Sequence, residues 1–153
     1  MPMEPNIKLE PNLEQHEGNK SNSYVALLGE LQFLANTTRP DVACAVNKLV
    51  VYTGNPSLQH VSALKRILFY LAGTKIYGIT YQKPPADNPN LFYGYTDTMF
   101  TNTDNYKSTS GYVFLSGGGA ITWRLKKQTT IALSLTEAEY VCYITVGTFT
   151  QRG

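Results

Sequence analysis

The sequence predicts a fold of the α+β or α/β class, in which three helices precede an antiparallel meander of three strands and a further helix. Apolar residues recur at helical spacing through residues 23–73. Aromatic and β-branched residues then form short extended runs between residues 91 and 124, separated by glycine-rich and polar turns. The helical half therefore precedes the strand half along the chain, and a last helical pattern begins at Thr136.

The helical half divides at two turn signals, residues 38–41 and 54–57. We expect Ser23 to cap the first helix, Pro40 and Asp41 to open the second, and Gly73 to close the third. The predicted apolar faces are Val25, Leu28, Leu31 and Ala35 in the first helix, Val42, Ala45, Val46 and Leu49 in the second, and Val61, Leu64, Leu68 and Leu71 in the third. Residues 1–21 contain few apolar residues and are predicted to be an extended or disordered leader.

The second half is predicted to be mainly extended. A short strand is expected at residues 77–81, and the loop 83–90 marks the boundary between two domains. The meander then comprises residues 91–96, ending at Asp97, residues 110–115 and residues 120–124, with a turn at 117–119. Residues 128–134 are expected to be extended, and a helix is expected over residues 136–148 with Ala138 on its apolar face.

Composition restricts the class of protein. Apolar residues make up 42% of the 153 residues and charged residues 16%, which is typical of a globular protein. Neither a signal peptide nor a membrane-spanning apolar run is recognisable, which predicts a soluble intracellular protein, cytoplasmic or nuclear, without a membrane partner. Cys44 and Cys142 lack metal-ligand spacing and are interpreted as buried thiols in a reducing compartment.

Three acidic residues carry the chemical hypothesis: Asp97 follows an apolar strand, and Glu137 and Glu139 open a later helix. Carboxylates held on rigid elements are the ligands that Mg²⁺ prefers, and such ions cleave phosphodiesters by activating water and stabilising the leaving oxygen. Taken singly, an Asp after a strand is more often a turn or capping residue, and glutamates in a first helical turn are favoured by the helix dipole.

The surrounding sequence resembles the polyprotein of copia-type retrotransposons at the junction between reverse transcriptase and ribonuclease H. The resemblance covers nearly the whole chain. It is carried by residues 28–41, 60–75, 107–114, 118–123 and 126–129, by Gly94-Tyr95-Thr96-Asp97, and by Ser134-Leu135-Thr136-Glu137-Ala138-Glu139-Tyr140-Val141.

The resemblance implies three regions: a leader (1–21), a helical connection segment of the reverse transcriptase (22–82), and a partial ribonuclease H-like domain (83–153). It implies that Asp97 and Glu139 are the catalytic, metal-binding residues for Mg²⁺ or Mn²⁺, and that the partner is an RNA–DNA hybrid or another nucleic acid. Glu137 is the weaker candidate, because it lies about 200° from Glu139 around a helix and only one of the two can face the sheet.

Departures from the family pattern predict weak metal binding. Thr98-Met99-Phe100 stands where the family usually has Ala-Asp-Trp, and Leu135 where a Ser is usual. The further acidic residues of the family lie beyond the last helix of this chain. With two carboxylates a cation is held loosely, so we expect little or no cleavage by this chain alone. The missing strand would also leave an open sheet edge, where self-association is expected.

Charge points to a second hypothesis, a nucleic-acid-binding module without catalysis. Residues 31–130 carry ten basic and four acidic residues. Trp123, Arg124, Lys126 and Lys127 are expected to lie around a hairpin end, where cations contact phosphates and an aromatic ring stacks on a base. A solvated turn with Trp123 in the core explains the same residues. An adopted protein-interaction module and a product without function are the remaining alternatives.

Overall fold

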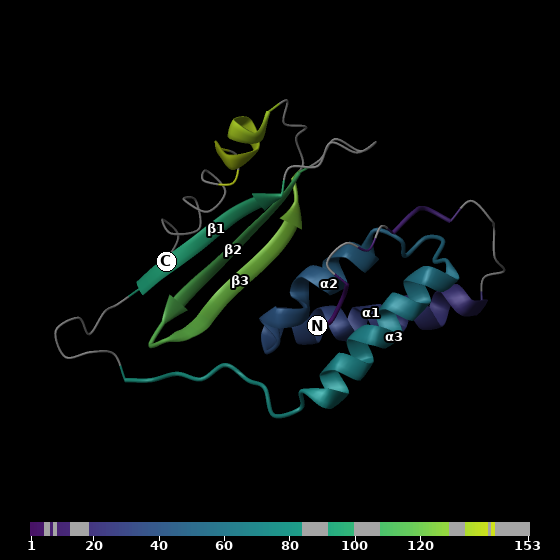
Figure 1. The fold of residues 1–153 in the computed structure, drawn as a ribbon, viewed down its shortest axis with the longest axis horizontal. Helices are drawn as coiled ribbons and strands as arrows, with labels where there is room; N and C mark the ends of the chain where they lie inside the picture. The colour runs from purple at the N-terminus through teal and green to yellow at the C-terminus, as the bar shows by residue number, and fades with distance from the viewer. Residues whose placement is uncertain are drawn as a thin grey trace. The chain divides into compact units, whose positions relative to one another are not determined.

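The computed structural model describes two compact units, residues 1–78 and residues 79–153 (Figure 1). The residues described are 1–4, 7, 9–12, 19–83, 92–99, 108–128, 134–140 and 142. The sequence predicts a domain boundary at residue 83, a few residues beyond this division. That residue 83 separates two domains of the family stays a prediction.

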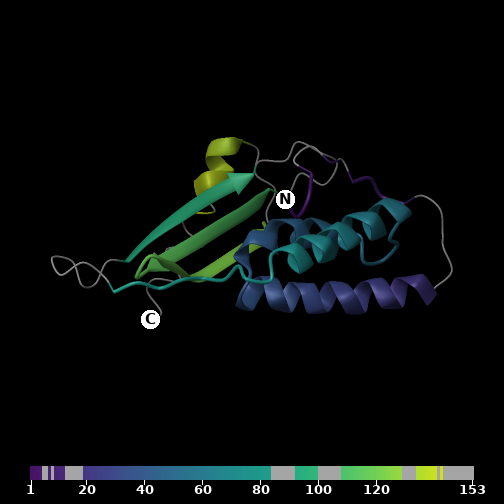
Figure 2. The same cartoon turned by 60° about the horizontal axis from the view of Figure 1, so that its bottom comes forward.

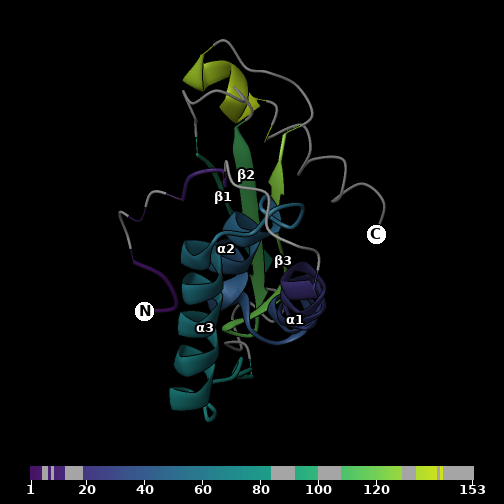
Figure 3. The ribbon, with the colours of Figure 1, turned by 90° about the vertical axis from the view of Figure 1, so that its right-hand side faces the viewer.

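The first unit contains α1 (Asn19–Thr37), α2 (Pro40–Val50) and α3 (Leu58–Gly73). α2 packs against both α1 and α3, as Figure 2 shows, and Figure 3 views α1 nearly end-on. The predicted apolar face of α2 is confirmed, since its four residues are all buried. Pro40 opens α2 and Gly73 is the last residue of α3, as expected.

Two predictions on α1 are wrong. The helix already begins at Asn19, so Ser23 lies inside it and is not its cap. Val25 is 43% exposed, and Tyr24 is buried in its place, together with Leu28, Leu31 and Ala35. Burial of Tyr24 is possible because its hydroxyl donates to the Leu49 carbonyl oxygen at 3.1 Å. The prediction from apolar spacing left out Tyr24 because the tyrosine side chain carries a polar hydroxyl group.

The buried face of α3 is rotated relative to the prediction. His60, Ala63, Leu64 and Ile67 are buried, while Val61, Leu68 and Leu71 are only partly buried at the edges of that face. Cys44, predicted to be buried, is exposed, because it lies on the opposite side of α2 from its buried residues.

The described part of the N-terminal leader has no helix or strand at residues 1–4, 7 and 9–12, and it packs on the helices. Met3 is buried in the helical core, and Ile7 and Leu9 are partly buried against it. The Tyr52 hydroxyl donates to the Leu9 carbonyl oxygen at 2.7 Å. The last residues of the predicted leader, 19–21, already belong to α1.

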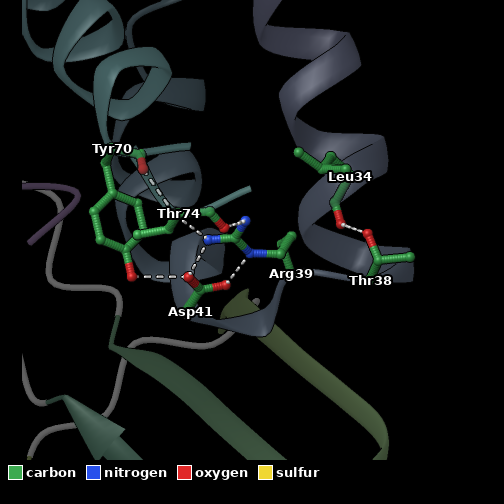
Figure 4. Close-up of polar contacts among 6 residues, drawn as sticks. All are labelled: Leu34, Thr38, Arg39, Asp41, Tyr70 and Thr74. Carbon is green, nitrogen blue, oxygen red and sulfur yellow. Dashed lines mark hydrogen bonds and ion pairs between the residues drawn. The ribbon is translucent and has the colours of Figure 1, made fainter. Parts of the chain in front are cut away.

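Arg39 joins the start of α2 to the end of α3 (Figure 4). Its guanidinium donates to both carboxylate oxygens of Asp41, at 2.9 and 2.8 Å, and to the carbonyl and hydroxyl oxygens of Thr74, at 3.0 and 2.7 Å. The Tyr70 hydroxyl donates to Asp41 at 2.9 Å. The hydrogen bond from Arg39 holds the pKa of the Asp41 carboxyl below its ordinary value.

The second unit contains a sheet of β1 (Phe92–Met99), β2 (Thr109–Ser116) and β3 (Gly119–Lys127). The strands are antiparallel in the order β1-β2-β3, which confirms the predicted meander and the mixed helix and sheet class. Gly117 and Gly118, both with positive φ (57° and 76°), form the tight turn between β2 and β3.

Other strand predictions need correction. Residues 77–81 do not form a strand; instead the Gln82 amide donates to the Gly117 carbonyl oxygen at 2.6 Å, and the Tyr81 hydroxyl to that of Ala120 at 2.7 Å. β1 continues through Asp97, which pairs with Gly111 and therefore lies within the strand and not at its end. β2 and β3 also extend beyond their predicted bounds, to Thr109–Ser116 and Gly119–Lys127.

The C-terminal helix is described at residues 135–140 and at Cys142. Ser134 begins it, since its hydroxyl oxygen accepts the Glu137 backbone N–H at 3.2 Å. The remainder of the predicted helix to residue 148, and the predicted extended residues 129–133, lie outside the described residues. Among the helices within the described ranges, none has the length and apolarity that a membrane crossing requires.

Candidate functional site

The C-terminal helix packs on one face of the sheet through two residues one helical turn apart. Ala138 is fully buried and Cys142 is 2% exposed. Cys142 packs with Phe114 and Tyr112 of β2. The buried side chain of Gln128 donates to the Ser110 hydroxyl at 2.7 Å and to the Ala138 carbonyl at 2.9 Å. Ser110, Tyr112 and Phe114 alternate along β2 and so define the helix-bearing face.

Asp97 touches this helix through its backbone. Its carbonyl oxygen lies 3.7 Å from the Cys142 Sγ, and its exposed carboxylate accepts the backbone N–H of Thr98 at 2.8 Å. Asp97 pairs with Gly111, and side chains directly across a ladder share a face. The Asp97 carboxylate therefore lies on the face of Tyr93 and Tyr95, opposite the helix-bearing face.

Glu139 and Glu137 are both exposed. Ala138 and Cys142 mark the buried side of the helix, and Glu139 lies about 80° from its centre whereas Glu137 lies about 120° away. Glu139 is thus nearer to the sheet, in line with its choice as the candidate. Within the described ranges, no group of three or more His, Cys, Asp or Glu side chains is placed to hold a metal ion. The catalytic roles of Asp97 and Glu139 stay predictions.

The four residues of the predicted nucleic-acid patch are divided between two faces. All four lie within β3, which continues to Lys127, and residues 129–133, which would complete a hairpin there, lie outside the described residues. Arg124 and Lys126 pair with Tyr112 and Ser110 and lie on the helix-bearing face, where both are exposed. Trp123 and Lys127 are on the face of Asp97 and are partly buried.

The predicted burial of Cys142 is confirmed, but the sequence analysis did not predict that Cys142 and Gln128 contact both the helix and the sheet. One sequence feature could have marked Gln128 as a contact residue: it is the first polar, uncharged residue after Lys126 and Lys127, at the end of an alternating run. β1 has one strand neighbour in the described sheet. Self-association through this edge stays a prediction.

Comparisons with known proteins place the chain in a family. No family model and no solved structure matches it. It is 41% identical to Secreted RxLR effector protein 161 of Plasmopara viticola, over 80% of this chain and 84% of that protein. It is 42% identical to the retrovirus-related Pol polyprotein from transposon RE2 of Arabidopsis thaliana, over 85% of this chain, and 37% identical to that from transposon TNT 1-94 of Nicotiana tabacum, over 92%.

The chain belongs to the family of retrovirus-related Pol polyproteins of transposons, and the resemblance to the copia type is confirmed. It spans about a tenth of the length of these polyproteins, 9% of the RE2 protein and 10% of the TNT 1-94 protein. It matches the shorter effector protein over most of that protein's length.

Proposed function

We propose that the chain is the segment of a Pol polyprotein that connects the end of the reverse-transcriptase region to the first half of a ribonuclease H-like domain. The order of its elements supports this proposal: a helical unit, then an antiparallel meander, then a helix packed on the sheet through Ala138 and Cys142. The ancestral reaction is metal-dependent hydrolysis of RNA in an RNA–DNA hybrid during reverse transcription.

In this proposal Asp97 and Glu139 are the inherited ligands of Mg²⁺ or Mn²⁺, and this chain alone cleaves little or nothing. The expected inactivity is supported by the placement of the Asp97 carboxylate on the sheet face opposite the helix that bears Glu139, a placement that counts against joint binding of one ion by the pair. A cation with one carboxylate ligand is bound weakly and stabilises the transition state poorly. Each 1.4 kcal/mol of lost transition-state stabilisation lowers the cleavage rate about tenfold.

A cleavage assay tests this proposal. A labelled RNA–DNA hybrid is incubated with Mg²⁺ or Mn²⁺ and the whole chain, or its Asp97→Asn, Glu139→Gln or Glu137→Gln variants. We expect background hydrolysis in every case, because no variant removes a working site. Strong cleavage that is lost in Asp97→Asn and Glu139→Gln, but kept in the matched Glu137→Gln control, would disprove inactivity while locating the site at the predicted pair.

A second candidate function is nucleic-acid binding without catalysis. The observation that favours it is the exposure of Arg124 and Lys126 on one face of β3, at alternate positions and so side by side. Two neighbouring cations on a rigid strand suit successive backbone phosphates.

Binding should therefore depend on salt and on these two side chains. We expect the affinity for an RNA–DNA hybrid to fall with rising salt, and the Arg124→Ala/Lys126→Ala variant to reduce the slope of log K against log salt by about 2, or about 1 per lost phosphate contact. Fluorescence anisotropy over a salt series measures this slope. Lys65→Ala/Lys75→Ala, which removes two exposed cations from the helical unit, is the matched control. Equal slopes for the two double variants would count against this interface.

A further inference from the structure

His60 is a fully buried histidine near the start of α3, and its contacts define its protonation state. The backbone N–H of Ser57 donates to its Nδ1 at 2.8 Å, and the Ser57 hydroxyl lies 2.9 Å from the same atom. Because Nδ1 accepts a backbone N–H, it carries no proton, so the ring is neutral with its proton on Nε2. Nε2 is buried and has no hydrogen-bond partner among the described residues.

The ring of His60 also supports the N-terminal segment, which here means residues 9–12. Tyr52 stacks on the imidazole with ring centroids 4.0 Å apart and planes 17° apart. The Tyr52 hydroxyl holds the Leu9 carbonyl oxygen at 2.7 Å. Asn55, in the same α2–α3 connection, donates to the Asn12 carbonyl oxygen at 3.0 Å. The cap of α3, the stacked ring and the N-terminal segment thus form one continuous chain of contacts.

We propose that His60 is a pH-sensitive latch, which holds the N-terminal segment on the helical unit when its ring is neutral and releases it when the ring is protonated. Protonation converts Nδ1 from an acceptor into a donor that faces the Ser57 N–H, so the reciprocal cap of α3 opens. It also places a positive charge in a buried site, which is unfavourable without a paired anion. Movement of the ring then withdraws the stacking partner of Tyr52.

The sign of the pH effect follows from burial. Burial lowers the pKa of His60 below its ordinary value of 6.5. As pH falls, the unfolded chain takes up this proton before the folded chain does, so stability is complete above pH 6.5 and is lost below it. The titratable groups on the described neighbouring segments include Tyr24 and Glu30 of α1, Asp41 and Lys48 of α2, Tyr52 of the α2–α3 connection, and Glu4 and Glu10. Of these, Tyr52 contacts the ring, and its own pKa is raised by burial, so it stays neutral at acid pH.

Equilibrium unfolding of the whole chain between pH 7.5 and 5.5 tests the latch, with the helical circular dichroism signal as the probe. We expect the equilibrium constant of unfolding to rise below pH 6.5, by at most about tenfold for each pH unit, and to level off once the folded ring is protonated and the N-terminal segment is released. His60→Gln keeps an acceptor at the position that Gln favours in a capping box and removes the titration, so its unfolding constant should stay level over this range. His16→Gln, which removes the other of the two histidines, should behave like the unsubstituted chain.

Amide hydrogen exchange, expressed as protection factors, reports on release of the N-terminal segment. We expect the amides of Leu9, Glu10 and Asn12 to lose protection at pH 5.5 in the unsubstituted chain and to keep it in His60→Gln; Pro11 has no amide proton. Tyr52→Phe retains a stacked ring but removes the donor to Leu9, so protection there should be low at both pH values. An unchanged pH dependence in His60→Gln would overturn the proposal. Should that variant not fold, an NMR titration of the unsubstituted chain decides: a His60 pKa at or above 6.5 would also overturn it.

Discussion

Replacing Arg39 by methionine is expected to lower the free energy of unfolding of the helical unit by about 3 kcal/mol. The Arg39 side chain is 9% exposed, and its guanidinium makes four hydrogen bonds to Asp41 and Thr74. Methionine fills similar volume but leaves the Thr74 carbonyl oxygen without its donor at the end of α3. Arg39→Lys should also destabilise the unit, because an ammonium group cannot reproduce the planar bidentate contact.

Urea denaturation of the whole chain measures this loss, and Arg66→Met is the matched control. Arg66, like Arg39, forms an ion pair, in this case with Glu4. The Arg66 side chain is 47% exposed and that of Glu4 is 59% exposed, so the control should change stability by less than about 1 kcal/mol. Equal losses in the two variants would mean that the Arg39 contacts contribute no more than a surface ion pair.

Replacing Leu49 by alanine is expected to cost about 2–5 kcal/mol, because it opens a cavity in the core of the helical unit. Leu49 is fully buried, and its backbone carbonyl oxygen accepts the Tyr24 hydroxyl. Burial, with a smaller contribution from Tyr52, raises the pKa of Tyr24 to about 12. A cavity that admits water should bring this pKa back towards 10, so one substitution changes both stability and the alkaline titration of tyrosine.

Thermal or urea unfolding and a spectrophotometric tyrosine titration check these two effects. Leu58→Ala is the control, since Leu58 is 73% exposed, and it should change stability by no more than about 0.5 kcal/mol. A loss below about 1 kcal/mol in Leu49→Ala, with an unchanged titration, would show that α1 and α2 do not meet tightly at this residue.

The parts of the fold that the sequence predicted well are those with local signals. α2 is an example: Pro40 fixes its first turn, Asp41 suits its N-terminal end, and its apolar spacing is undisturbed. Tyr24 and His60 were assigned wrongly or overlooked because each buries polar atoms. The Tyr24 hydroxyl has its acceptor on α2, whereas the His60 ring accepts from Ser57 three residues earlier and stacks on Tyr52. The strand expected at 77–81 has suitable residues, but a strand also requires a pairing partner, which periodicity does not reveal.

The sequence points to candidate site residues, whose roles stay predictions, but it does not show how their side chains are arranged. The sequence located Asp97 near a strand end and Glu139 early in a helix. It did not show that β1 continues through Asp97, and a continuing strand fixes the face on which a side chain lies. The same alternation separates Arg124 and Lys126 from Trp123 and Lys127. An error of one or two residues in the predicted bounds of a strand therefore changes which side chains are expected to lie close together.

Among the described residues, two hydrophobic clusters share no residue: one lies within residues 1–78, and the other contains Phe114, Cys142 and Tyr112. Units with separate cores can unfold in separate transitions. A single unfolding midpoint fitted to the whole chain would then average two different unfolding equilibria. The helical unit buries by far the larger cluster. We therefore expect the sheet to lose its structure first, leaving a folded helical remnant as a populated intermediate.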